Sequence, residues 1–181
     1  MSENVGTAAF VNDKMCGELN SIETISLLTT RNNIDRFLIS IPDPYDDEKY
    51  IDIYISPEKS PDIKVNTSNY SPYIKAKFTF TGRIYSMTSD SKYLSPEVLD
   101  NISEYCNKYL ENIFSEFFYK TSKELKSDIC GIGKYALSNF ATTQEFNDYN
   151  WEKNYQNAFF KVEVNTLSLI HISEPTRLQL I

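Results

Sequence analysis

The sequence has few of the residues that catalytic and metal sites most often use. Its 181 residues include a single histidine, His171, and three cysteines. A single histidine argues against Ser–His or Cys–His catalysis and against a zinc site built from histidines. Cys16, Cys106 and Cys130 show no C-x-x-C spacing and are odd in number, so we expect three small buried side chains and no disulfide framework.

Long apolar runs and excess positive charge are also absent. No stretch approaches the roughly 18 apolar residues of a membrane span, and no charged-then-apolar signal segment opens the chain. The net charge is −7, which argues against nucleic acid as a partner because phosphate binding needs clustered Lys and Arg. Hydrophobic residues make up 41% of the chain, enough for one folded domain, and we expect the chain itself to be soluble.

Alternating and helical patterns are what the sequence does contain. Strands are predicted over residues 36–41, 49–56, 62–66, 72–87 and 158–166, because apolar and polar residues alternate there. A capping-box spacing at Asn20 and Glu23 predicts a short helix over 21–29. Ser95 and Pro96 begin a long helix over about 95–126, with Glu104–Lys108 and Glu116–Lys120 as ion pairs one turn apart. The predicted class is α+β, a mostly antiparallel β-sheet with the long helix and shorter helices packed on one face.

The last fifteen residues break with this pattern. Residues 167–177, "LSLIHISEPTR", resemble the translation of a transposase-based sequencing adapter. We therefore expect a single domain over residues 6–166 and a non-native, adapter-derived tail over 167–181. His171 lies in that tail, so the expected native part contains no histidine at all.

The segment "SDICGIGKY" poses the question of a phosphate-binding loop. A dinucleotide fingerprint needs a third glycine, where Ala136 stands, and a preceding strand, where a helix is predicted. A Walker loop is also excluded by the spacing. The favoured interpretation is that Gly131 and Gly133 end one helix and allow another to start, with Ser127 or Asp128 as the cap.

Three other groups of polar and aromatic residues are better explained by packing, solvent exposure or protein contacts than by catalysis or metal binding. The acidic stretch Asp43, Asp46, Asp47 and Glu48 fits no calcium-loop spacing and is expected to be a solvated hairpin loop. Trp151 is expected to anchor the core, with a ligand-stacking platform as the alternative. Tyr50, Tyr54 and Tyr85 fall on the polar face of the predicted sheet. They form a possible docking face, although scattered surface tyrosines explain the pattern equally well.

Several motifs in order resemble one known family. "GTAAFVNDKMCGELN", then "SDICGIGKY" after a long helix, then "YNWEKNYQNAFFKVEV" look like the C-terminal domain of the Ger(x)C spore-germination proteins, the C subunits of germinant receptors. The resemblance covers roughly residues 6–166. The positions that carry the family motif are Ser127, Asp128, Gly131, Gly133, Asn150 and Trp151.

The resemblance implies a non-catalytic receptor component. It implies a lipoprotein on the outer face of the inner spore membrane that assembles with the A and B subunits and acts in nutrient-triggered germination. The family's signal peptide, lipid-attachment cysteine and N-terminal domains are missing here, so either Met1 is an internal methionine of a longer protein or the gene is broken. No enzyme activity, cofactor, metal or direct small-molecule ligand is expected. The alternatives are a stand-alone ligand-binding module that uses Trp151 and a hydrolase that uses two carboxylates.

Overall fold

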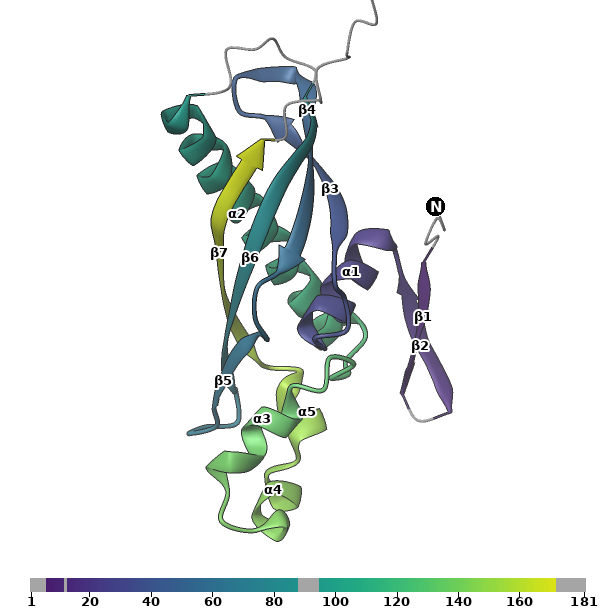
Figure 1. The fold of residues 1–181 in the computed structure, drawn as a ribbon. Coiled ribbons are helices and arrows are strands. Elements are labelled where there is room, and N and C mark those ends of the chain that lie inside the picture. Colours follow the sequence, from purple (N-terminus) through teal and green to yellow (C-terminus); the bar gives the residue numbers. More distant parts are fainter. Residues whose placement is uncertain (1–5, 12, 88–94, 172–181) are drawn as a thin grey trace, which may run out of the picture.

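The computed structural model describes residues 6–11, 13–87 and 95–171, which form a five-stranded sheet, a separate two-stranded sheet and several helices (Figure 1). The larger sheet has the order β3–β4–β6–β5, and β7 pairs with the other edge of β6. The predicted α+β class is confirmed. Its strands are β3 (Phe37–Asp43), β4 (Asp46–Pro57), β5 (Asp62–Asn66), β6 (Tyr73–Met87) and β7 (Phe159–His171).

The long helix α2 (Pro96–Tyr119) covers one face of this sheet. Ser95 accepts a hydrogen bond from the Val98 amide, and Pro96 occupies the first turn, as the sequence predicts. Phe114 stacks on Phe78 with ring centroids 4.5 Å apart. This apolar contact, repeated along the helix, forms the core. The buried residues of α2 are Ile102, Cys106, Leu110, Phe114, Phe117 and Phe118.

Strand β6 is the centre of the sheet and follows the predicted alternation. Ile74, Ala76, Phe78, Phe80 and Ile84 are all buried on the helix side. Strand β5 pairs with the first half of β6 and β4 with the second half, both antiparallel. Strand β7 runs parallel to β6 along its opposite edge. The sheet is therefore mostly antiparallel, as expected, with one parallel strand.

The outer edge of β7 is covered by side chains of α2. The Asn107 carboxamide oxygen accepts hydrogen bonds from the amide and the hydroxyl of Thr166, at 2.9 and 2.7 Å. One turn further along the helix, Glu111 accepts from the Val164 amide at 2.9 Å. Free strand edges expose unpaired donors that invite association, so these contacts let β7 lie at an edge beside a helix.

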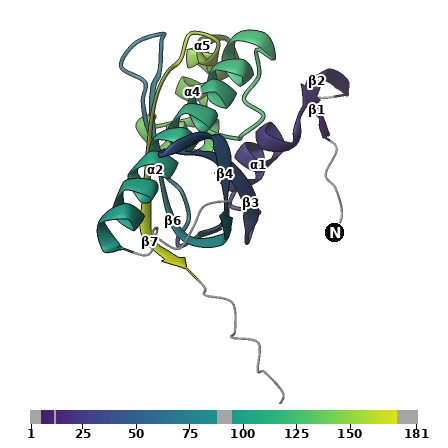
Figure 2. The ribbon, with the colours of Figure 1, turned by 90° about the horizontal axis from the view of Figure 1, so that it is seen from above.

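The N-terminal hairpin stands apart from the large sheet, whereas the helix that follows it lies beside the sheet (Figures 1 and 2). Strands β1 (Thr7–Val11) and β2 (Lys14–Leu19) form a hairpin, followed by α1 (Ser21–Thr30). The predicted capping box is present: the Asn20 side chain accepts from the Glu23 amide, and the Glu23 carboxylate accepts from the Asn20 amide. An isolated two-stranded hairpin is only marginally stable in water, so this hairpin depends on its contacts with the rest of the protein for stability.

The C-terminal elements differ from the sequence expectation in two ways. The long helix changes to a π-helix, η2 (Lys120–Glu124), before the glycines. Strand β7 continues to His171, beyond the predicted end at residue 166, and the β6–β7 register shifts between the Phe80–Thr166 and Gly82–Leu169 pairs. The division into a domain over 6–166 and a tail over 167–181 stays a prediction.

The remaining short helices lie together at one end of the sheet (Figure 1). They are α3 (Gly133–Ala136), η3 (Leu137–Asn139), α4 (Thr143–Tyr149) and α5 (Trp151–Tyr155).

The cover of β7 by α2 gives a testable consequence for stability. We expect Asn107→Ala to lower the free energy of unfolding by about 1–2 kcal/mol, because the buried Thr166 amide and hydroxyl lose their acceptor. Urea denaturation followed by circular dichroism measures this. Glu104→Ala is the control on the same helix: it removes only an exposed pair with Lys108 and should leave the stability nearly unchanged. Equal losses in both variants would contradict the role of Asn107.

Candidate functional site

The six residues that the resemblance predicts as motif positions lie on two segments, which Asp128 joins; we call them the motif junction (Ser127, Asp128, Gly131, Gly133, Asn150 and Trp151). Asp128 lies at its centre. Its Oδ1 accepts from the Ile132 amide at 2.8 Å, and its Oδ2 accepts from the Gly133 amide at 2.6 Å and from Trp151 Nε1 at 2.9 Å. The carboxylate thus accepts from amides at the start of α3 and from the indole N–H at the same time. Neither Ser127 nor Asp128 occupies the N-cap position of α3, which is Ile132, so the predicted cap is wrong in position; Asp128 instead reaches the first amides of α3 from the preceding turn.

Backbone geometry explains the small and polar residues of the junction. Gly131 has φ +72°, in the left-handed region that disfavours side chains with a Cβ. At Gly133 a Cβ would lie 2.8 Å from Trp151 Nε1, so only glycine lets the indole approach. Asn150 has φ 55°, ends α4, and its side chain accepts from the Lys153 amide at the start of α5.

Burial at the junction removes nucleophiles. Trp151 is only 5% exposed, which confirms its expected role as a core anchor and leaves no open ring face for ligand stacking. Burial, followed by the charge of Asp128, raises the pKa of the Cys130 thiol well above its usual value. Burial also raises the pKa of Tyr155, whose hydroxyl lies 2.7 Å from Thr121 Oγ1. Neither group is ionised near neutral pH, so the junction holds structure together and offers no thiolate.

The three cysteines are all free thiols, and two of them match the expected burial. Cys106 and Cys130 are buried, whereas Cys16 on the hairpin is only partly buried, so the prediction of three buried side chains is wrong for Cys16. Figure 1 shows the hairpin away from the large sheet, and its side chains Phe10 and Met15 are 59% and 50% exposed. Burial raises the pKa of the Cys106 thiol to about 12, so this group also stays protonated.

A second region is the tyrosine face (Tyr50, Tyr54 and Tyr85) on the sheet side opposite α2. Tyr54 and Tyr85 meet edge to face with centroids 5.1 Å apart, and Arg36 lies over the Tyr54 ring at 4.9 Å. Tyr85 reaches this position at a bulge, where Asp52 pairs with Ser86 and Ile53 with Ile84. Tyr50 shares the face of β4 with Tyr54 and is 57% exposed.

Polar contacts fix the strands beneath these rings. Asp52 accepts hydrogen bonds from Ser40 on β3 at 2.5 Å and from Ser86 on β6 at 2.8 Å. The carboxylate therefore links three neighbouring strands on their outer face. Leu38, which pairs with Tyr54 across β3 and β4, is 40% exposed. The tyrosine face is thus a rigid, mixed aromatic and polar surface, and no helix of the described residues lies over it.

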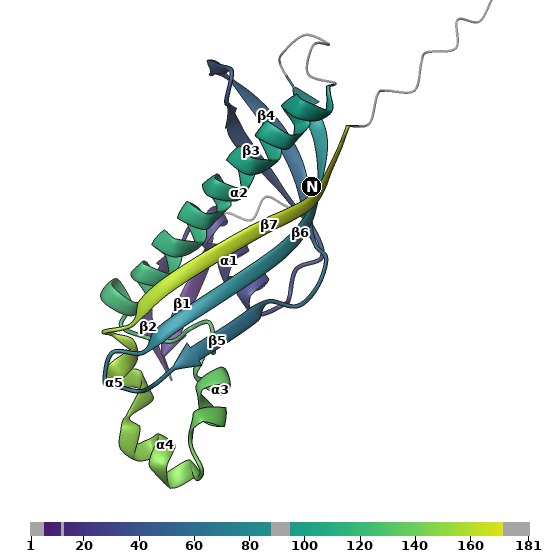
Figure 3. The ribbon, with the colours of Figure 1, turned by 90° about the vertical axis from the view of Figure 1, so that its left-hand side faces the viewer.

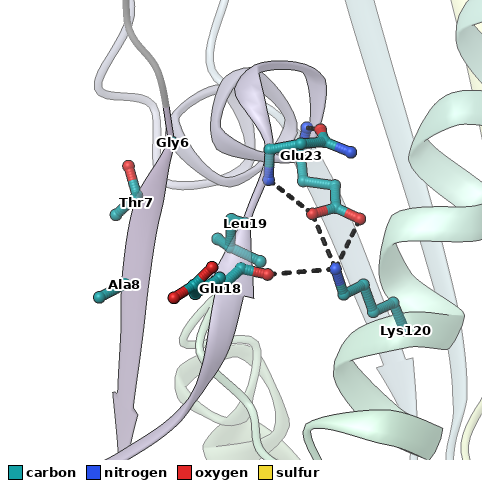
Figure 4. Close-up of a pocket in the computed structure, with 8 residues that line it drawn as sticks. Gly6, Thr7, Ala8, Glu18, Leu19, Glu23 and Lys120 are labelled. Carbon is teal, nitrogen blue, oxygen red and sulfur yellow. Dashed lines mark hydrogen bonds and ion pairs between the residues drawn. The ribbon is translucent and has the colours of Figure 1, made fainter.

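A third region is the hollow around Lys120, between the hairpin, α1 and the start of η2 (Figure 4). Lys120 Nζ lies 2.8 Å from both oxygens of Glu23 and donates to the Glu18 carbonyl at 3.2 Å. Both charged side chains are largely buried. Helical spacing predicts Glu116 as the partner of Lys120, and that prediction is wrong. The sequence marks Glu23 only as a cap, because its partner lies 97 residues away.

Groups that would support metal or acid–base chemistry are scarce. Among residues 6–11, 13–87 and 95–171, no three His, Cys, Asp or Glu side chains lie close enough together to hold a metal ion. In the acidic stretch, Asp43 accepts from the Tyr45 amide and Asp46 pairs with Lys49. The pKa of Glu152 is raised by partial burial and by the neighbouring Asp128 charge. Glu152 lies at the surface of α5, and partial burial raises its pKa more than the neighbouring Asp128 does.

Comparisons with known proteins give two matches. A family model described as "Spore germination B3/ GerAC like, C-terminal" matches residues 5–171. A solved structure titled "Crystal Structure of the GerBC protein" is similar with a TM-score of 0.71 and 17% sequence identity, covering 93% of this chain and 50% of that chain. The chain therefore spans half the length of that structure, and the likeness shows the fold. No curated protein sequence matches the chain.

The Asp128 contacts predict a large effect from one substitution. We expect Asp128→Ala to lower the free energy of unfolding by about 3 kcal/mol, because three donors lose their acceptor. Trp151 is the single tryptophan, so its emission reports on the site directly and should shift to longer wavelength in the folded variant. Asp128→Asn keeps one carbonyl oxygen, so its free energy of unfolding should lie between those of the unchanged protein and of Asp128→Ala. Unchanged emission in Asp128→Ala would contradict the assignment.

The two glycines separate steric from conformational effects. We expect Gly131→Ala to destabilise the protein by about 1 kcal/mol through backbone strain alone, since a Cβ there meets nothing within 4 Å. Gly133→Ala should destabilise it by about 2–3 kcal/mol and perturb Trp151 emission, because the new methyl group displaces the indole. Denaturation curves and emission spectra of both variants test this. A larger spectral change in Gly131→Ala would contradict the steric explanation.

Proposed function

Because the chain belongs to the spore germination B3/GerAC-like, C-terminal family, we propose that it is the C-terminal domain of a germinant receptor C subunit. In this proposal it acts in nutrient-triggered germination through contacts with the A and B subunits and catalyses no reaction. The resemblance seen in the sequence is confirmed by the family match over residues 5–171. The partners, the absence of catalysis and the germinant response are the proposed part.

The tyrosine face is the observation that carries the docking proposal. Tyrosine and arginine are enriched where proteins bind one another, because large rings and planar guanidinium groups gain contact at little entropic cost. Tyr54 contacts both Tyr85 and Arg36 on a sheet face that no described helix covers. Asp52 holds the underlying strands in register, so the surface is preorganised for a partner.

Membrane attachment belongs to the same proposal. Membership of a germinant receptor family supports association with the membrane, and we propose the outer face of the inner spore membrane, with a lipid anchor in the N-terminal part of the protein. A domain held by such an anchor would rest close to the bilayer surface. Within residues 6–11, 13–87 and 95–171, no helix has the length and apolar character needed to cross a bilayer.

The two alternatives receive less support from the geometry. A ligand-binding module built on Trp151 would need an open indole, whereas this one is buried and donates its N–H to Asp128. A hydrolase with two carboxylates would need a carboxyl group of raised pKa inside a cleft, whereas Glu152 lies at the surface of α5. The contact surface is the stronger candidate for function.

A double substitution tests the docking role. We expect Tyr54→Ser with Tyr85→Ser to abolish co-purification with the A and B subunits and to slow nutrient-triggered germination at least about tenfold, as loss of an interface hot spot would. The spore response to nutrients and a pull-down from solubilised membranes measure the two effects. The free energy of unfolding should change by less than about 1 kcal/mol, because both rings lie on the outer face.

The matched control is Tyr70→Ser, since Tyr70 is 74% exposed but lies in the loop between β5 and β6. It should leave co-purification and germination unchanged. If the double variant assembles and germinates normally, the tyrosine face is not the docking surface. If deletion of the whole gene leaves the nutrient response intact, the receptor role itself is wrong.

A further inference from the structure

The outer face of β5, β6 and β7 carries an ordered set of charged residues that the motif junction and the tyrosine face do not use. In Figure 3 these strands lie toward the viewer and no helix passes in front of them. Strand pairing aligns Lys64, Lys75 and Lys161 in one row across the three strands. The next row holds Asp62, Lys77 and Glu163. We call these six residues the lysine array.

Three lysines directly opposite one another are unfavourable for the fold itself. Like charges on paired strands repel, so this row opposes strand pairing except where carboxylates beside it offset the repulsion. Glu163 offsets part of the repulsion, with ion pairs to Lys75 at 2.8 Å and to Lys161 at 3.1 Å. Asp62 Oδ2 lies 3.8 Å from Lys64 Nζ, which offsets a further part. Four lysines against two carboxylates leave a net charge of +2 on this patch, in a chain whose total is −7.

Lys77 stands out within the array. It forms no ion pair or hydrogen bond with any residue in the described ranges, although Glu163 is its direct neighbour on β7. The carboxylate of Glu163 turns to Lys75 and Lys161 instead. One ammonium group in the middle of the sheet thus remains available to an external anion.

Exposed aromatic rings border the array on one side. The row next to the three lysines contains Tyr73, which is 46% exposed, and Phe159, which is 58% exposed. A phenylalanine this open on a sheet face leaves apolar area in water. Lysines beside aromatic rings on an extended surface match the chemistry of a membrane interface. Ammonium groups there meet lipid phosphates, and rings enter the headgroup region.

We propose that the lysine array, with Tyr73 and Phe159, is the surface by which this domain lies against an anionic lipid bilayer. The inference rests on the proposed membrane attachment and adds the orientation of the domain to it. A sheet face suits a planar surface, and the acidic remainder of the molecule turns away from a negative membrane. A long polyanion such as RNA would meet that acidic remainder as well, which favours the membrane.

The array and the tyrosine face occupy different parts of the same sheet side. Tyr73, Lys75 and Lys77 lie in the first half of β6, whereas Tyr85 lies near its end. A domain resting on the bilayer with the first half of β6 therefore keeps the second half free for a partner subunit. The two proposals are compatible in one assembly and separable by substitution.

Vesicle binding of the 181-residue chain tests the inference. The probes are large vesicles of phosphatidylcholine alone and of phosphatidylcholine with 30% phosphatidylglycerol, in low salt and in 0.3 M NaCl. We expect sedimentation with the anionic vesicles only and loss of binding in high salt, because exposed charges are screened. Lys64→Glu with Lys77→Glu should weaken the partition coefficient about tenfold or more. Phe159→Ala should weaken it about threefold.

Matched controls separate local from overall charge. Lys108→Glu with Lys153→Glu makes the same change in net charge on α2 and α5, and Phe10→Ala removes a ring that is 59% exposed on the β1–β2 hairpin. Both should bind as the unchanged chain does. Equal weakening in array and control variants would overturn the proposal, as would absence of binding to anionic vesicles at low salt.

Three further outcomes separate this inference from its rivals. If the array variants lose affinity for a single-stranded RNA but not for vesicles, the array binds nucleic acid and the membrane proposal is wrong. If vesicle binding fails while the Tyr54 and Tyr85 substitutions still block receptor assembly, the orientation is wrong and the receptor role stands. If vesicles bind as expected while the tyrosine variants assemble normally, the orientation stands and the tyrosine face is not the docking surface.

Discussion

The packing of α2 against one face of the sheet is the constraint on which the rest of the structure depends. The helix buries its apolar stripe on Phe78 and Phe80 and, with Asn107 and Glu111, supplies the acceptors that the edge of β7 lacks. One helix thus builds the core and closes an edge. Since no described helix covers the other face, every surface that we assign to a partner lies on that side of β6.

The π-helix at the end of α2 joins three parts of the molecule. Lys120 binds Glu23 of α1, Thr121 meets Tyr155 of α5, and Lys123 donates to the Gln156 carbonyl. A regular α-helix would turn these side chains to other directions, and π-segments often occur where such precision is needed. The hairpin on one side and the motif junction on the other are therefore held by residues of one helical turn.

The sequence predicted local features well and distant contacts poorly. Alternation over β6, the caps at Asn20 and Ser95 and the α+β class depend on neighbouring residues, and all are found. The motif residues were identified by resemblance, but nothing in their spacing joins Asp128 to Trp151. The partner of Lys120, the parallel pairing of β7 and the π-helix also escaped prediction, because each depends on residues far away in the chain.

The distribution of charge shows why composition alone misleads about partners. A total of −7 describes the field at a distance, yet a partner in contact senses charges within about one Debye length, roughly 8–10 Å. Within that range of Lys75, strand pairing places two more lysines and an unpaired third. Asp62 and Glu163 offset only part of their repulsion, because two carboxylates face four lysines. An exposed group of lysines that is only partly neutralised within the chain is suited to contact with an external anion.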